Sequence, residues 1–237
     1  WSQELFAREV IILYGAYTND EANPLQDLAI QYADFSVWQR QWLEGVILEK
    51  QLAYWRQKLA EAPSALELPT DRSRPLVQTF NGANYTFHIS LELLQAINTL
   101  CQQEGVTLFM LLLAAFKVLL ARNTNQSDIL VGSPIANRNH AQLEGLIGFF
   151  VNTLVLRTDL GQNPTFRELL KRVRQTTLEA YSNQDIPFEQ LVALLQPERN
   201  LSISPFFQVM LVLQNVPVRY EPLVGIEVEP YGVEETT

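Results

Sequence analysis

The sequence predicts a layered α/β fold. Apolar residues recur at helical spacing along much of the chain, and short β-branched runs lie between such stretches from residue 85 onward. Hydrophobic residues make up 47% of the 237 residues and charged residues 18%, which provides a core and too little charge for a disordered chain. Mixed helices and strands pack in layers because each apolar face must be buried against another element.

The first part of the chain is predicted to be helical. A helix is expected over residues 2–14 with Ser2 as its N-cap, and a longer helical stretch over residues 28–59. Gly45 is expected to separate that stretch into two helices. One stripe of the stretch carries four aromatic side chains: Tyr32, Phe35, Trp38 and Trp42.

Residues 62–75 contain three prolines, Pro63, Pro69 and Pro75, which exclude regular structure and favour an extended linker between two lobes. Beyond it, alternation in residues 85–89 predicts a half-buried strand. The next helix has Leu94, Ile97 and Cys101 on one face and ends at Gly105.

The remaining pattern alternates. An apolar helix is expected from Thr107 to about residue 121, a buried strand over 128–134 and a second strand over 149–156. Thr165 and Glu168 form a capping box that opens a helix with Phe166, Leu169, Leu170 and Val173 facing inward. Asp185 is expected to cap a short helix whose inward residues are Phe188, Leu191, Val192 and Leu195. Residues 206–214 are expected to form a buried strand. Ile226 and Val228 are expected to lie in an edge strand.

Charge and composition exclude several classes of protein. The formal net charge is −9, from 17 Lys+Arg and 26 Asp+Glu, without a basic cluster, so we expect neither nucleic-acid nor anionic-membrane binding. The most apolar run, residues 108–121, is shorter than the ~20 residues of a membrane span and contains Lys117. The single Cys101 excludes an internal disulfide, which fits a reducing, cytoplasmic location.

Common catalytic signatures are absent from this sequence. It has no phosphate-binding glycine loop with Lys, no Gly-x-Ser-x-Gly elbow and no His-Glu-x-x-His zinc helix. One cysteine and two distant histidines do not supply the usual zinc ligands, so no metal site is expected. We interpret His88 and His140 as surface residues, Cys101 as packing, and Ser133 as lacking a base nearby in sequence.

Five strings carry a more specific signal. They are the opening Trp1-Ser2 pair, YADFSVWQR (32–40), IGFFVNTLVLR (147–157), NQDIPFEQL (183–191) and RNLSISPFFQVM (199–210). In this order they closely resemble the core motifs of condensation domains from nonribosomal peptide synthetases, and the resemblance covers nearly the whole chain. One departure is Asn183, where the family usually has histidine; the amide removes a titratable group and keeps the capacity for hydrogen bonds.

The resemblance implies a chloramphenicol-acetyltransferase-like fold with two lobes. We expect residues 1–62 to belong to the N-terminal lobe, 63–80 to the linker between lobes, and 81–237 to a C-terminal lobe truncated at its end. The family signature is His-His-x-x-x-Asp-Gly, usually followed by a Trp-Ser-like pair, and its second histidine is the catalytic one. This chain is expected to begin just after that glycine, so most of the N-terminal lobe and the catalytic histidine would lie outside it.

The function implied by the resemblance is amide formation between two thioesters held by carrier domains. The expected partners are donor and acceptor peptidyl carrier domains and an adjacent adenylation domain in the same synthetase. Phosphopantetheine would be carried by those partners and no cofactor by this chain. Residues 1–237 would be inactive alone.

The resemblance also points to site residues. Asn152 matches the Asn of the family's Gly-x-Phe-Val-Asn string at the active-site tunnel, where its amide would donate to an oxyanion or orient the surroundings of the histidine. A purely structural role for Asn152 is the alternative. Arg138 matches a family arginine and would pair with a carboxylate across the lobes or remain solvated, and Asp34 with Arg40 would form a local structural pair.

Two other functions remain open at this point. The first is a carrier-binding module without catalysis. The second is an acyltransferase of the same fold that acts on a free small molecule, or an epimerising relative, although the strings at 32–40 and 147–157 fit members that form peptide bonds better.

Overall fold

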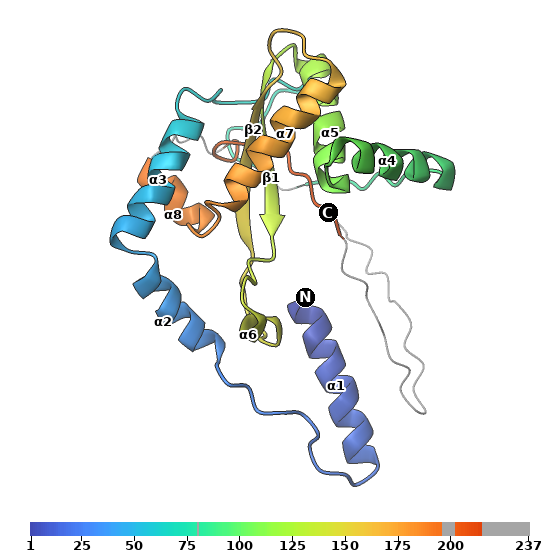
Figure 1. Ribbon diagram of the computed structural model, residues 1–237, viewed down its shortest axis with the longest axis vertical. Coiled ribbons are helices and arrows are strands. Elements are labelled where there is room, and N and C mark those ends of the chain that lie inside the picture. The colour runs from blue at the N-terminus through green and yellow to red at the C-terminus, as the bar shows by residue number, and fades with distance from the viewer. Residues whose placement is uncertain (80, 196–201, 215–237) are drawn as a thin grey trace. The chain divides into compact units, whose positions relative to one another are not determined.

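The computed structural model describes residues 1–79, 81–195 and 202–214. Contacts between residues group the chain into two compact units. The first contains Trp1–Glu44 and Ala136–Val151, and the second contains Gly45–Ile135 and Asn152–Leu213. Helices and strands occur together, as the predicted α/β class requires (Figure 1). The lobe boundary at residues 63–80 stays a prediction, but residues 62–75 have no helix or strand, as their prolines indicate.

The first unit consists of α1 (Ser2–Thr18), α2 (Tyr32–Trp42) and the single turn α6 (Ala141–Glu144) (Figure 1). Consecutive rings of the predicted α2 stripe are in contact, with ring centroids 6.2, 5.8 and 5.4 Å apart from Tyr32 through Trp42. The buried cluster of this unit brings α2 together with the 136–151 segment; it contains Phe35, Leu143, Leu146 and Phe150.

The start of α1 differs from the prediction. Trp1 is the N-cap, and Ser2 is the first helical residue. The Ser2 hydroxyl caps nothing in its own helix and bonds with Gly148 instead. The expected break at Gly45 is confirmed: α2 ends at Trp42, α3 begins at Gly45, and Gly45 has a φ of +52°, a left-handed conformation that glycine adopts without strain.

The second unit contains five helices and two strands among its described residues. They are α3 (Gly45–Leu59), α4 (Leu91–Glu104), α5 (Leu108–Thr124), β1 (Asp128–Ile135), β2 (Asn152–Asp159), α7 (Phe166–Tyr181) and α8 (Phe188–Leu195). The strands pair antiparallel, from Asp128 opposite Asp159 to Ile135 opposite Asn152. Helix α5 packs against β1, and α7 packs against both α5 and β2 (Figure 1).

Local signals placed the helix ends of this unit well. The Thr107 hydroxyl accepts from the N–H of Met110 and opens α5. Thr165 and Glu168 form the predicted capping box at α7, with the Thr165 N–H donating to the Glu168 carboxylate at 2.7 Å. Gly105 ends α4 with a φ of +62°. These signals succeed because a cap needs only residues within one turn.

Several strand predictions were wrong. Residues 85–89 form no strand, and Tyr85 is 89% and Phe87 71% exposed. Among the described residues this segment pairs with neither β1 nor β2, and an extended segment without a partner forms no ladder. Strand β2 begins at Asn152 instead of residue 149, and Phe149 is 75% exposed. Residues 206–214 contribute only one parallel bridge, Met210 with Gly132. The expected strand at Ile226 and Val228 lies outside the described residues.

Two helix faces are also less buried than predicted. Leu94 in α4 is 37% exposed, so that only Cys101 is buried in that helix. Phe166 in α7 is 38% exposed, whereas the predicted inward residues Leu169, Leu170 and Val173 are buried. The apolar spacing therefore identified the correct face of each helix but overstated its width.

No single helix of the described residues is both long and apolar enough to cross a membrane. Helices α4 and α5 pass that test of length and composition only when joined, and they meet at a bend of 103°.

Lys117 joins α5 to both strands in the core of the second unit. Its side chain is fully buried, and Nζ donates to the carbonyls of Ile129 at 3.0 Å and Leu156 at 2.6 Å and to the Thr158 hydroxyl at 3.0 Å. These acceptors occupy all three ammonium donors. Burial among apolar side chains keeps the pKa of Lys117 well below its ordinary value.

A Lys117→Met variant should separate the charge of this lysine from its packing. Between the lowered pKa of the folded state and the ordinary pKa of about 10.4, Lys117 of the wild type is protonated in the unfolded state and neutral in the folded state. The free energy of unfolding therefore rises with pH in this range. The slope approaches about 1.4 kcal/mol per pH unit. The variant lacks this contribution. Urea unfolding of both proteins from neutral pH to pH 10 should therefore give a difference in unfolding free energy that grows with pH; parallel curves would contradict the assignment.

Candidate functional site

Asn152 is the predicted site residue with the most complete set of contacts. It is the first residue of β2 and is 6% exposed. Nδ2 donates to the carbonyls of Gln184 at 2.7 Å and Ile186 at 2.9 Å. Oδ1 accepts from the N–H groups of Phe188 at 2.9 Å and Thr153 at 2.8 Å. An amide offers two donor hydrogens and two acceptor lone pairs, so this side chain is fully used.

These contacts join two of the strings found in the sequence. Asn152 belongs to the 147–157 string, and its distant partners all lie in the 183–191 string. The bond from Phe188 gives a partner to the first N–H of α8, the role predicted for Asp185. Asp185 pairs with Gln51 of α3 instead, accepting from Nε2 at 2.6 Å and donating its N–H to Oε1 at 3.1 Å.

The bonds of Asn152 serve a supporting role, which we retain as a proposal. Both Nδ2 hydrogens are directed at main-chain carbonyls, and donation to an oxyanion would require one of these bonds to break. Asn183, at the start of the second string, donates from Nδ2 to the Glu179 carbonyl at 2.9 Å, so the amide uses its hydrogen-bonding capacity at the end of α7.

Arg138 lies in the first unit and organises its loop. Nη1 donates to the carbonyls of Leu143 and Leu146, the latter at 2.8 Å, and Nη2 donates to the Ser2 hydroxyl at 3.0 Å. The guanidinium also lies over the ring of Phe150, with Cζ 4.1 Å from the centroid. Partial burial lowers the pKa of Arg138 from its ordinary value. Its contacts within the described residues are main-chain, hydroxyl and aromatic groups; pairing with a carboxylate stays a proposal.

Asp34 and Arg40 do not pair with each other. The Asp34 carboxylate accepts from the N–H of Gln31 at 2.7 Å and so stabilises the first turn of α2, whereas Arg40 lies in the last turn. Six residues on a helix advance about 9 Å along the axis and end on different faces, which separates the two side chains. The expected local pair is therefore corrected to a cap by Asp34 alone.

The predicted residues divide between the two units. Asn152 belongs to the second unit, and Arg138, Asp34 and Arg40 belong to the first. Ser2 was predicted only as a cap, yet it bonds with both Arg138 and Gly148. The sequence favours a cap because the hydroxyl of a serine before a helix most often bonds within that helix. The contacts with Arg138 and Gly148, which are distant in the sequence, leave no local pattern around Ser2.

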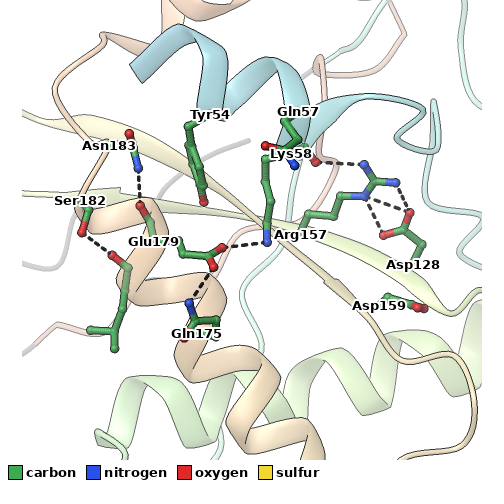
Figure 2. A pocket seen from close by; sticks show the side chains of 11 residues that line it. Tyr54, Gln57, Lys58, Asp128, Arg157, Asp159, Gln175, Glu179, Ser182 and Asn183 are labelled. Carbon is green, nitrogen blue, oxygen red and sulfur yellow. Dashed lines mark hydrogen bonds and ion pairs between the residues drawn. The ribbon is translucent and has the colours of Figure 1, made fainter. Parts of the chain in front are cut away.

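A pocket of about 1020 Å³ lies in the second unit, bounded by α3, α7 and the strand ends (Figure 2). Arg157 is the centre of its polar lining. Nε and Nη2 donate to the Asp128 carboxylate at 2.6–3.0 Å, and Nη1 donates to the carbonyls of Lys58, in the last turn of α3, and Ala60, just after it. Nη2 also reaches the carbonyl of Glu61 at 3.3 Å. The pair is bidentate, and the guanidinium satisfies carbonyls that α3 leaves open.

A second ion pair lies in the lining of the pocket. Lys58 of α3 bonds with Glu179 of α7 at 3.3 Å, and Gln175 donates to the same carboxylate at 2.7 Å (Figure 2). Among the described residues, the hydroxyl of Tyr54 is the buried side-chain polar atom without a partner, and burial together with the charge of Glu179 raises its pKa. These ion pairs and hydrogen bonds hold α3 and α7 to the strands. Their structural role is sufficient to explain the polar side chains that line the pocket, without a bound ligand. The sequence had not indicated Arg157 because its partners lie far away in the chain.

An Asn152→Asp variant should test the donors of Asn152. The carboxylate keeps the oxygen that accepts from Phe188 and Thr153 but places a second oxygen against two carbonyls. Unfolding free energy should fall by about 3 kcal/mol, because two buried bonds are replaced by repulsion. Asn123→Ala is the matched control, since the exposed Asn123 amide makes one bond within α5 and its loss should change stability by less than about 0.5 kcal/mol. Equal urea midpoints for Asn152→Asp and wild type would contradict this assignment.

Comparisons with known proteins relate these features to a family. The family model described as condensation domain matches residues 1–230. One of the linear gramicidin synthase proteins of Brevibacillus parabrevis is 55% identical over 235 residues, which are 99% of this chain and 5% of that protein. Malpibaldin synthetase of Mortierella alpina is 49% identical over 228 residues, which are 96% of this chain and 4% of the synthetase. This chain thus spans a small part of its curated relatives.

Solved structures agree with the sequence comparisons. The X-domain in a complex with OxyB from teicoplanin biosynthesis superimposes with a TM-score of 0.82 at 29% identity, over 88% of this chain and 47% of that chain. A four-domain nonribosomal peptide synthetase bound to AMP and glycine matches with a TM-score of 0.80 at 27% identity, over 91% of this chain and 16% of the synthetase.

Proposed function

This chain belongs to the condensation-domain family, and from that premise we propose that it is part of a domain that forms amide bonds between carrier-bound thioesters in nonribosomal peptide synthesis. The observation that carries the proposal is the family match over residues 1–230, together with the hydrogen bonds of Asn152 to Gln184 and Phe188. That residue ties the 147–157 string to the 183–191 string, so motifs separated in sequence form one local structure.

The proposed reaction is an aminolysis. The amine nitrogen of the acceptor attacks the carbonyl carbon of the donor thioester, a C–N bond forms, the C–S bond breaks, and the donor's sulfur leaves as thiolate while the amine loses a proton. Because a thioester is already activated, the protein mainly has to position the two reactants, and proximity contributes roughly 7–11 kcal/mol in favourable cases. A base that removes the amine proton would add roughly 10²–10⁴-fold.

Within this chain we assign supporting roles. Asn152 holds the start of α8 against the start of β2, and Arg138 holds the 136–151 segment. Residues 1–237 contain His88 and His140 but no His-His-x-x-x-Asp-Gly string. We therefore propose that the catalytic histidine belongs to the segment that precedes Trp1 in the complete domain.

The partners follow from the proposed reaction. Donor and acceptor carrier domains would present the two thioesters on phosphopantetheine arms, and an adenylation domain of the same synthetase would load them. Support comes from the relatives, which are named as synthases and synthetases, and from the superimposed four-domain synthetase. We propose a cytoplasmic location for such a synthetase, which the single cysteine of residues 1–237 fits.

A second candidate is a docking module without catalysis. The specific observation in its favour is the X-domain, which has been solved in a complex with OxyB and superimposes with a TM-score of 0.82. By analogy, this chain would belong to a domain that binds a partner protein on the same scaffold. A scaffold alone does not fix function, so the two candidates need an experiment that separates them.

Amide formation by two proteins should distinguish the candidates. One protein is residues 1–237 alone, and the other is the complete domain with its upstream segment. Each is mixed with donor and acceptor carrier domains that bear aminoacyl thioesters, and the acceptor-bound product is measured by mass spectrometry. We expect product only from the complete domain. Replacement of the second histidine of its His-His-x-x-x-Asp-Gly signature by alanine should reduce the rate of amide formation by roughly 10²-fold or more.

The outcome decides between the proposals. Product from the complete domain supports amide synthesis. If several matched carrier pairs give no product, while the complete domain still binds a partner protein, the enzymatic proposal is wrong and the docking module replaces it.

A further inference from the structure

The hydroxyl of Ser2 makes three hydrogen bonds to residues far away in the sequence. It donates to the carbonyl of Gly148 at 2.8 Å and accepts from the N–H of the same residue at 3.2 Å. It also accepts from Nη2 of Arg138 at 3.0 Å. A serine hydroxyl has one donor and two acceptor lone pairs, so these bonds use its full capacity.

The preceding residue is held by the same segment. The indole N–H of Trp1 donates to the carbonyl of Glu144 at 2.9 Å, and the guanidinium of Arg138 lies over the indole ring with Cζ 5.5 Å from the centroid. Two consecutive residues at the entry to α1 are thus fixed to residues of the Ala136–Val151 segment, all within the first unit.

These bonds do not serve the helix in which Ser2 lies. Helix α1 has no side-chain cap, and its first closing bond runs from the N–H of Leu5 to the carbonyl of Trp1. The Ser2 side chain is therefore not required to begin the helix. Its bonds instead determine where the chain enters α1 relative to Gly148 and Arg138.

We infer that Ser2 is a positioning residue for amide synthesis: its hydroxyl fixes the segment preceding Trp1 against the Ala136–Val151 segment. The inference rests on the proposed function, which places the catalytic histidine in that preceding segment. A residue advances the chain by at most about 3.6 Å, so residues a few positions upstream lie close to Ser2 and are tethered to the point that its hydroxyl fixes. A displacement of about 1 Å in a reacting group can cost about 10²-fold in rate.

The tests use the complete domain and its two loaded carriers. Ser2→Ala removes all three bonds, Ser2→Thr keeps a hydroxyl, and Ser2→Cys keeps the volume with a weak donor and acceptor. Thr18→Ala is the matched control, because the Thr18 hydroxyl lies at the other end of α1 and bonds only to carbonyls of its own helix. The measured quantities are kcat, the KM for the acceptor carrier, and the melting temperature.

We expect kcat to fall between about 10-fold and 100-fold in Ser2→Ala, with KM within about twofold of wild type. Ser2→Thr should recover most of the rate, and Thr18→Ala should match wild type. If Ser2→Ala is unfolded at the assay temperature, Ser2→Cys takes its place in the same comparison.

Three results would overturn the inference. They are an unchanged kcat in a folded Ser2→Ala or Ser2→Cys variant, a loss confined to KM, and unfolding of both variants, which would make the hydroxyl a stabiliser of the fold only. A wild-type domain that forms no amide would instead contradict the proposed function, so the two failures are distinguishable.

Discussion

Buried main-chain polar groups need hydrogen-bond partners even where their own helix or strand does not supply enough of them, and this constraint shapes both units of the protein. Four long or amide side chains supply the missing donors. Arg138 and Arg157 satisfy carbonyls at or just after helix ends, Lys117 satisfies carbonyls of both strands, and Asn152 satisfies carbonyls before α8. Each joins segments that lie far apart in the sequence, so loss of one donor would loosen two segments together.

The sequence predicted those features that depend on neighbouring residues. Thr107 was identified as the start of a helix and Thr165 as part of a capping box, because a helix start is determined within one turn. Gly105 was identified as a helix end because a left-handed residue ends a helix locally. The strand at residues 85–89 was wrong for the opposite reason. Alternation reports which side chains prefer burial, but a strand exists only when another strand is available to pair with it.

The same distinction explains the candidate site. The motif strings were apparent in the sequence through their resemblance to a family, whereas the contact between two of them became visible only in three dimensions. For Asn152 the resemblance implies donation to an oxyanion or orientation of the histidine's surroundings, and its four bonds in the structure are to the main chain. Ser2 had been expected to cap α1, and its hydroxyl is bonded to Gly148 and Arg138. The N-cap prediction for Ser2 was therefore wrong, whereas the supporting role of Asn152 stays a proposal.

The proposed reaction would depend chiefly on positioning, and polar side chains in these strings bond to the main chain, as such a reaction requires. An activated thioester needs little assistance in bond breaking, so much of the rate must come from the placement of two reactants and one proton acceptor. Placement is controlled by the segments that carry the reacting groups, and we propose that Ser2, Arg138 and Asn152 help to hold those segments through the bonds described above. A docking module would also need a rigid scaffold, but it would not need the entry to α1 to be fixed by a hydroxyl with all its bonds directed at one distant segment. The enzymatic proposal requires such a fixed entry to α1, and only the formation of product separates it from docking alone.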